Sequence, residues 1–372
     1  MGDSSAPYPS RWSGYIQCHK TPIYDPRGDV QLVLSKRITP SAISPNTGTG
    51  PTKKVQDGGE AQLEAPAGQN NGASPAEAPT AHENQEIEAK VSSKHLSLAS
   101  KVFRAMFDGN FREGVALGAD QATKVPLPED NADAMMVLLG IIHGLNRSVP
   151  RKIEYALFFA IVVLIDKYEL QEATGVYTDL WFSDLWPARN TLTPHLADRI
   201  YTCWVLRRPV EYTEVTRDAI YWCTSHFEEN GLPFPPAIPS KIEASRLSII
   251  GDMLIYLNDT VERYQSDTQQ CLRHAECDAL VLGDLIKKLK LKGLYPIPQA
   301  TALDISIMEL FSRLRALGVS SLCEIYPLTQ LKPSRCIPKL DLRFCGVMKG
   351  LESELSKLEK RIQGLTLPFF TP

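Results

Sequence analysis

Cys271, His274 and Cys277 place two thiols and an imidazole at three-residue spacing, and zinc prefers such ligands. The pattern contains no CxxC pair, so any fourth ligand must come from far along the chain. In a helix, the three side chains would spread over about 120° of the circumference, which suits buried packing at least as well as one metal. Because cysteine is commonly buried, we expect packing here, with no metal ligand and no cofactor. The distant cysteines that could act as a fourth ligand are Cys323, Cys336 and Cys345.

Other segments offer little that resembles a catalytic site. Gly48–Lys54 contains glycines and lysines but lacks the GxxxxGK[ST] spacing and a following helix that could bind phosphate. GxSxG, HExxH and GxGxxG patterns are absent from the sequence. His95 and His143 lie near expected helix ends, where a structural role is the usual one. We therefore predict no catalytic residue and no enzyme. The alternative is an enzymatic or metal-binding region hidden in Ser240–Pro372.

Composition is that of an ordinary globular protein. The 372 residues are 43% hydrophobic and 22% charged, enough for two domains with packed cores. Forty basic and 43 acidic residues give a net charge of −3, too little positive field for nucleic acid as a direct partner.

No segment predicts membrane insertion or secretion. The longest apolar run, Tyr155–Ile165, is shorter than the roughly 20 residues that a bilayer requires, and charged residues flank it. Met1–Trp12 has no signal-peptide pattern. Eight scattered cysteines are typical of reduced thiols. We expect a cytoplasmic and/or nuclear protein.

The first half is expected to combine strands, helices and one disordered insertion. Pro40–Asn84 is dominated by small and polar residues, which cannot bury enough apolar area to fold. Strand-like runs flank it at Asp29–Leu34 and Glu86–Val91, so the insertion interrupts one domain. Apolar residues at helical spacing follow over Leu96–Phe107. The remaining expected elements are a strand at Lys124–Leu127, a cap at Asp130, a helix ending at Gly144, a helix over Pro150–Tyr168, and a helix that contains Trp181 and Trp186.

The second half is expected to be helical throughout. Thr193 and Pro194 resemble a cap and first turn, while Ser240 and Glu243 match a capping box. Proline-rich Leu232–Pro239 is an expected linker. The other expected helices cover Leu196–Trp204, Tyr212–Glu229, a stretch reaching Lys290, Ala302–Leu317 and Leu340–Leu365.

Val91–Phe107, with its serines, Phe103 and the pair Met106-Phe107, resembles the strand-to-helix segment of BTB/POZ domains. Val125–Asp130 and the helix behind it are similar to the next strand and helix of that family, in the form abundant in fungi. The resemblance covers Ile23 to about Trp186 without the insertion. It implies a protein-interaction domain made of a small sheet flanked by helices.

Three departures from the family pattern stand out. Ser92 and Ser93 replace a frequent His-Lys pair, and a long loop separates two paired strands. The N-terminal strand and helix that many members exchange between subunits have no clear counterpart before Asp29. A homodimer by that route is therefore left open.

Phe111-Arg112-Glu113 is similar to the hydrophobic-x-Glu element with which some family members dock on a cullin ubiquitin-ligase scaffold. An apolar anchor would supply burial and the carboxylate a charge-assisted bond. The alternative is that Phe111 closes the core while Arg112 and Glu113 face water. The predicted partner-binding residues are Met106, Phe107, Phe111, Arg112 and Glu113.

Leucines near heptad spacing run along the last predicted helix, from Leu351 to Leu365. Barely two heptads make a weak isolated coiled coil, so packing on its own domain is favoured.

These patterns predict an α+β fold, with a BTB/POZ-like domain followed by an all-α C-terminal region. The predicted function is a non-enzymatic adaptor or scaffold that brings an unknown client to a cullin ligase, or a regulatory scaffold that binds no cullin. The predicted segments are a flexible N-terminus over 1–22, the BTB/POZ-like domain over 23–186 with its insertion at 40–84, a helical extension over 187–231, a linker over 232–239 and a helical region over 240–372.

Overall fold

The fold is described from a computed structural model. It describes residues 21–37, 84–109, 111–118, 123–186, 196–224, 227–271, 273–274, 276–325 and 346–367. The chain forms two compact units, Met1–Tyr177 and Thr178–Pro372. Helices and one small sheet confirm the α+β class. The boundary between the units falls nine residues before the predicted end of the first domain at 186.

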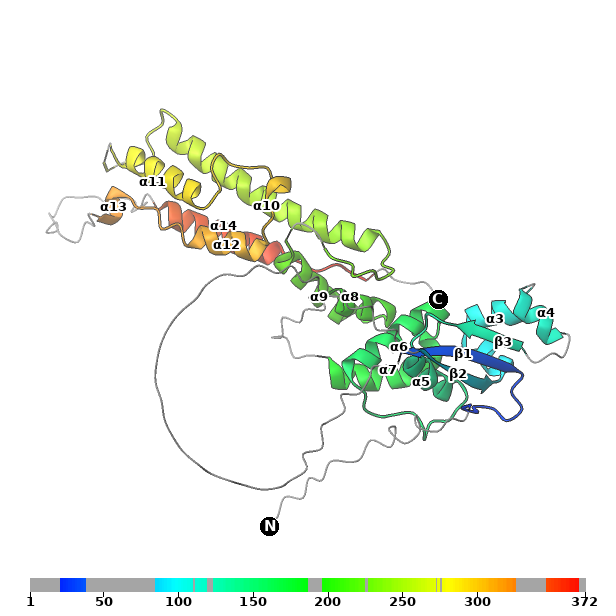
Figure 1. Ribbon diagram of the computed structural model, residues 1–372. Coiled ribbons are helices and arrows are strands. Elements are labelled where there is room, and N and C mark those ends of the chain that lie inside the picture. The colour runs from blue at the N-terminus through cyan, green and yellow to red at the C-terminus, as the bar shows by residue number, and fades with distance from the viewer. Residues whose placement is uncertain are drawn as a thin grey trace, which may run out of the picture. The chain divides into compact units, whose positions relative to one another are not determined.

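A three-stranded sheet forms the centre of the first unit. Strand β1 (Val30–Arg37) lies between antiparallel β2 (Asn84–Val91) and parallel β3 (Thr123–Leu127), as Figure 1 shows. Alternate residues of β1, namely Val30, Leu32 and Leu34, are buried. The three predicted strands are thus confirmed, each longer by one or two residues.

Helices cover this sheet, and the predicted helix over Leu96–Phe107 is in fact two. Ser100 is extended, and its side chain caps the second helix by accepting a hydrogen bond from the Phe103 amide at 3.0 Å. The predicted cap at Asp130 is also wrong, because Asn131 accepts from the Ala134 amide. The helices are α2 (Ser93–Ala99), α3 (Lys101–Asp108), α4 (Arg112–Gly118), α5 (Ala132–Ile142), α6 (Tyr155–Tyr168) and α7 (Gln171–Leu185), which runs across the boundary.

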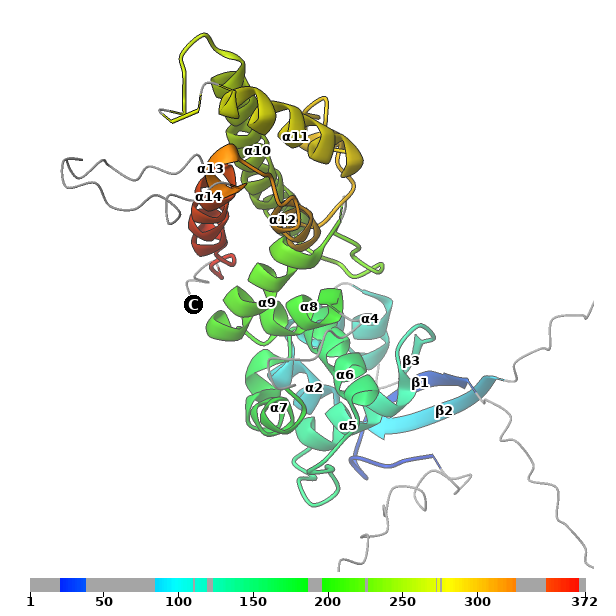
Figure 2. The same ribbon diagram turned by 90° about the vertical axis from the view of Figure 1, so that its left-hand side faces the viewer.

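The described part of the second unit is helical, as predicted. In it α11, α12 and α14 pack around the long α10 (Figure 2). The helices are α8 (Leu196–Val205), α9 (Pro209–Trp222), α10 (Ala237–Gln265), α11 (Cys277–Leu291), α12 (Ile307–Arg315), α13 (Leu322–Ile325) and α14 (Val347–Arg361), with a short 3-10 turn at Ala300–Ala302.

Two predictions around the proline-rich segment need correction. Helix α10 already begins at Ala237, so Ser240 lies inside it and donates its hydroxyl to the Pro236 carbonyl instead of capping. Glu243, the other half of the predicted capping box, pairs with buried Arg246 at 3.2 Å. Helices from both sides of 232–239 pack together, since α9 contacts α10 and α12. The segment is therefore a connection within one unit.

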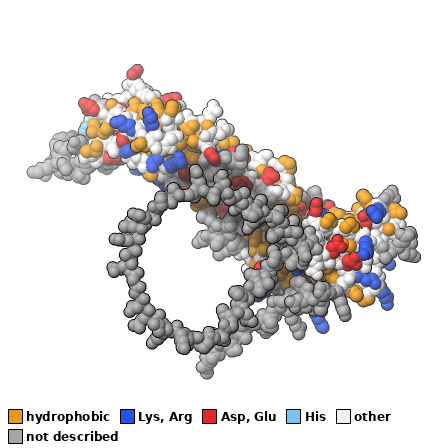
Figure 3. Space-filling view, in the orientation of Figure 1, with side chains coloured by type: hydrophobic (Ala, Val, Ile, Leu, Met, Phe, Trp, Pro, Cys, Tyr) orange, Lys and Arg blue, Asp and Glu red, His pale blue; other side chains and the backbone are white. Residues whose placement is uncertain are grey.

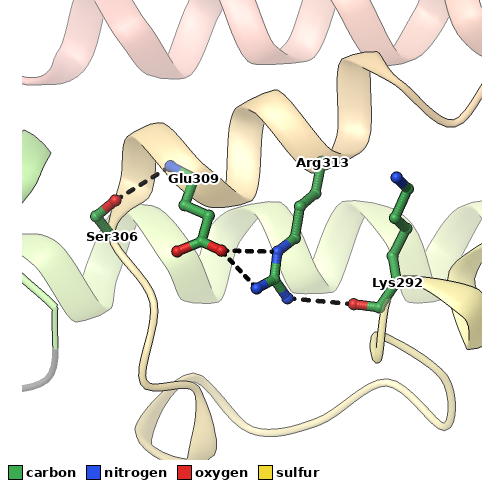
Figure 4. Close-up of polar contacts among 4 residues, drawn as sticks. All are labelled: Lys292, Ser306, Glu309 and Arg313. Carbon is green, nitrogen blue, oxygen red and sulfur yellow. Dashed lines mark hydrogen bonds and ion pairs between the residues drawn. The ribbon is translucent and has the colours of Figure 1, made fainter. Parts of the chain in front are cut away.

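Polar contacts hold α12 in place, whereas α14 packs through buried leucines. Ser306 caps α12 by accepting a hydrogen bond from the Glu309 amide. Arg313 donates to the Glu309 carboxylate at 2.5 Å and to the Lys292 carbonyl at 3.3 Å (Figure 4). In α14 three leucines of the predicted heptad seam, Leu351, Leu355 and Leu358, are buried, and the helix packs on α10 and α12; Leu365 lies beyond its end. Packing within its own unit, the favoured alternative, is confirmed.

Several predictions fall on residues outside the described ones. These are most of the N-terminal segment 1–22, the insertion 40–84 apart from its last residue, the Thr193–Pro194 cap, and Cys336 and Cys345.

His143 links α5 to the start of α2. Its Nδ1 contacts the Leu139 carbonyl at 2.9 Å, and its Nε2 accepts from the Ser92 amide at 3.1 Å. This pair of bonds requires the neutral imidazole. Burial, and next the neighbouring His95, lower the pKa of His143 in spite of the Leu139 bond. His143 is therefore structural, as the sequence suggested.

We predict that acidification destabilises the first unit through His143. The pKa of His143 is lower in the folded protein than the ordinary value of 6.5 that it has in the unfolded chain. Its contribution to the free energy of unfolding is therefore complete above about pH 6.5 and is lost as the pH falls through the folded pKa. Urea denaturation between about pH 5 and 7 should give a smaller decrease in unfolding free energy for His143→Gln than for wild type. Equal slopes for the two proteins would contradict this assignment.

Candidate functional site

A groove of about 460 Å³ opens on the first unit between α3, α4 and the residue that follows α6. Its lining is mostly apolar and also includes three charged residues. The lining residues are Lys101, Val102, Ala105, Met106, Phe111, Glu113 and Glu169.

The buried face of α3 is anchored to the end of α6. Ser100 donates its hydroxyl to the Tyr168 carbonyl at 2.6 Å. The Tyr168 ring stacks on Phe103, with centroids 4.5 Å apart and planes 4° from parallel. Phe103 in turn faces Phe107 at 6.0 Å. These contacts leave the opposite side of α3, with Val102 and Met106, to form the groove.

A buried carboxylate completes the anchor. Tyr168 donates its hydroxyl to Asp130 at 2.5 Å, and Lys167 pairs with the other oxygen at 2.5 Å. Asp130 is only 4% exposed, so these bonds are made in a low-dielectric interior. Burial, and then the bond to Asp130, raise the pKa of Tyr168, which keeps its hydroxyl protonated as a donor. Glu169, the next residue, is thereby held at the rim of the groove.

Glycine makes the turn between α3 and α4 possible. A Cβ on Gly114 would lie 2.6 Å from the Gly109 carbonyl oxygen and 2.7 Å from that of Phe107. At Gly109 a Cβ would lie 3.2 Å from the Phe111 ring and 2.5 Å from the Ala105 oxygen. The backbone can therefore fold closely over the end of α3, and this turn places Phe111 over the groove.

The structure brings three of the five predicted partner-binding residues together. Met106, Phe111 and Glu113 line one groove. Phe111 is 60% exposed, so the alternative in which it closes the core is wrong. Phe107 is 7% exposed and belongs to the core, while exposed Arg112 is not among the lining residues. Arg112 and Glu113 begin α4.

Sequence analysis missed four lining residues. Val102 belongs to the apolar periodicity predicted over Leu96–Phe107, which does not distinguish buried positions from groove-lining ones. Lys101 and Ala105 are one helical turn apart, a spacing that could have indicated a second face. Glu169 lies far along the chain, and the contacts of Tyr168 with Ser100 and Phe103 bring it to α3.

The character of the groove suits a protein partner. The exposed Phe111 ring, Met106 and Val102 provide apolar surface that a partner could bury. The lining also contains two acidic residues, Glu113 and Glu169, and one basic residue, Lys101. Apolar, acidic and basic side chains are intermingled on the surface of the first unit seen in Figure 3. Such a patch, with an aromatic centre and charged rim, has the composition of a binding hot spot.

The thiols considered as metal ligands lie in the second unit. Cys271 and Cys277 gather with Cys323, and the ligand atoms of the three lie within 4.8 Å of one another. The His274 imidazole does not belong to this group among the described residues.

Comparisons with known proteins provide no relative. No family model, no curated protein and no solved structure matches the chain. Within the described residues, none of the helices has the length and apolarity needed to cross a bilayer. What the groove does must therefore be inferred from its own residues.

We predict that Tyr168→Phe destabilises the protein by about 1–3 kcal/mol, because it removes a buried donor from Asp130. Urea denaturation measures the change. Tyr177→Phe is the matched control: its hydroxyl bonds Asn146 at the surface, so its loss should change stability by less than about 0.5 kcal/mol. Equal effects of the two substitutions would show that the Asp130 bond does not hold this unit.

Proposed function

We propose that the chain is a non-enzymatic adaptor of the BTB/POZ kind, which docks on a cullin ubiquitin-ligase scaffold through the α3–α4 groove. The observation that carries the proposal is the position of Phe111, an exposed aromatic ring held beside Met106 and Glu113. Phe111 lines the groove together with the apolar Val102 and Met106, and contiguous apolar surface of this kind marks interaction sites.

The order of elements supports the BTB/POZ part of the proposal. Two paired strands, three short helices (α2, α3 and α4), a third strand on the other edge of β1 and then α5 and α6 follow one another. That is the order which the resemblance over Ile23–Trp186 implies. The segment most similar to the family, Val91–Phe107, includes α3, the wall of the groove.

The chemistry of docking follows from the lining residues. A helix of the cullin would cover Phe111 and place an apolar side chain against Val102 and Met106. Basic groups of the cullin would meet Glu113 and Glu169 as charge-assisted hydrogen bonds. A standard interface includes about 20–30 residues on each side, many more than the seven that line the groove. The groove would therefore act as the central hot spot of a larger contact. The helical second unit is then available to bind a client.

The test compares wild type with Phe111→Ala/Glu113→Lys. We expect the wild type to bind a purified cullin N-terminal region and the double variant to bind at least about tenfold more weakly, as for loss of a hot spot. The matched control is Val176→Ala/Glu172→Lys, which makes the same kinds of change at exposed sites on α7 and should bind like wild type. Biolayer interferometry measures binding, and circular dichroism verifies that all three proteins fold.

Quantitative pull-down with mass spectrometry extends the test to other partners. Recovery of a cullin by wild type and control, but not by the groove variant, would support the adaptor. If folded wild type recovers no cullin, the cullin proposal is wrong. Partners that then depend on Phe111 and Glu113 would indicate the regulatory scaffold.

A further inference from the structure

Three thiols meet in the second unit, at a place unrelated to the groove. Cys271, Cys277 and Cys323 are buried, with at most 1% of any of them exposed. Their sulfur atoms lie within 4.8 Å of one another, and those of Cys271 and Cys323 are 3.6 Å apart. The cluster is formed across 52 residues of sequence, so short-range spacing does not account for it.

The helical geometry assumed for this segment is wrong. Helix α10 ends at Gln265 and α11 begins at Cys277, so Cys271 lies in the connection between them. The spread of about 120° expected for one continuous helix therefore does not apply. The connection folds back so that Cys271 faces the first turn of α11, and Cys323 in α13 joins them.

Asp278 holds the first two cysteines in place. Its carboxylate accepts hydrogen bonds from the Gln270 amide at 2.7 Å and the Cys271 amide at 3.0 Å. The Cys271 sulfur itself accepts from the His274 amide at 3.4 Å. Cys277 is the first residue of α11 and directly precedes Asp278, so the same turn of the helix carries both groups.

Asp284 on α11 positions the third cysteine. It accepts from the Ser320 amide at 2.8 Å and pairs with Lys288 at 2.7 Å, and Lys288 also donates to the Gly318 carbonyl. Burial raises the pKa of Asp284, but the bonds from Lys288 and Ser320 outweigh it, and the net pKa is lowered. The charged carboxylate thus fastens the residues just before α13 to α11. As a result Cys323 is directed at Cys277 and Cys271.

We propose that Cys271, Cys277 and Cys323 bind a zinc ion as thiolates. Zinc–sulfur bonds of about 2.3 Å in a tetrahedron place the sulfurs about 3.8 Å apart. The observed separations, from 3.6 Å to no more than 4.8 Å, require shifts of about 1 Å or less to reach that value. A disulfide would need one pair to approach to about 2.05 Å and would leave the third thiol unused.

Binding involves no oxidation or reduction. Each thiol releases its proton to solvent as its sulfur–zinc bond forms, and the zinc remains Zn²⁺. Because the sulfurs are shielded from solvent, the site is structural: it ties the α10–α11 connection and α13 to the start of α11. Tetrahedral zinc takes four ligands, so the three thiols of the described residues leave one coordination position to another donor.

The first test measures zinc in the full-length protein, purified without chelator from cells grown with added zinc. Mass spectrometry for metals should find about one zinc per chain in wild type and at least about tenfold less in Cys323→Ser. The matched control is Cys223→Ser, which removes a partly buried thiol just after α9 and should retain the zinc. A zinc content far below one equivalent in wild type would overturn the proposal.

A second measurement does not depend on whether the variant folds. Wild type reconstituted with Co²⁺ should show the intense sulfur-to-metal charge-transfer absorption and the visible bands of tetrahedral thiolate coordination. The melting temperature of wild type should fall when a zinc chelator is added, and that of Cys223→Ser should fall equally. Absence of the charge-transfer band, or an intact mass of native protein showing a Cys271–Cys323 disulfide, would refute the site.

Discussion

Tyr168 donates its hydroxyl to a carboxylate, Asp130, that is almost wholly shielded from water. Neither group can lose the other without leaving a polar atom buried and poorly satisfied. The same tyrosine stacks on Phe103, and its carbonyl accepts from Ser100, which begins α3. One residue at the end of α6 therefore sets the position of α3, and with it one wall of the groove. Because α3 is held in this way, the groove that Phe111 lines keeps its shape.

The elements that sequence predicted well are those with a strong period. Alternating residues gave β1 and β2, and three- to four-residue spacing gave the apolar faces of α3 and α14. Boundaries were harder, because side chains such as Ser100 and Asn131 compete with similar residues nearby for the role of cap. Phe111 and Glu113 were found through a family resemblance, but Glu169 was not, since no local pattern reports a contact across 68 residues.

The thiol cluster shows the same limit more sharply. Sequence spacing alone indicated that a continuous helix would spread Cys271 and Cys277 apart. A break after Gln265, with Asp278 binding the backbone of the connection, reverses that geometry. Asp284 then brings in a cysteine from α13. In a CxxC pair, short sequence spacing brings two sulfur atoms together. Here the carboxylates of Asp278 and Asp284 on α11 have that effect, because they bind the backbone near Cys271 and Cys323.

The strand register has a consequence for how this chain can be altered. Arg37 pairs directly with Asn84, so the chain leaves the sheet and rejoins it at adjacent points. Whatever lies between these residues need only close a loop, and doubling the length of a flexible loop costs about 0.6 kcal/mol. The insertion is thus a natural grafting point: a reporter domain with neighbouring termini could be spliced in there while the β1–β2 hydrogen bonds stay intact.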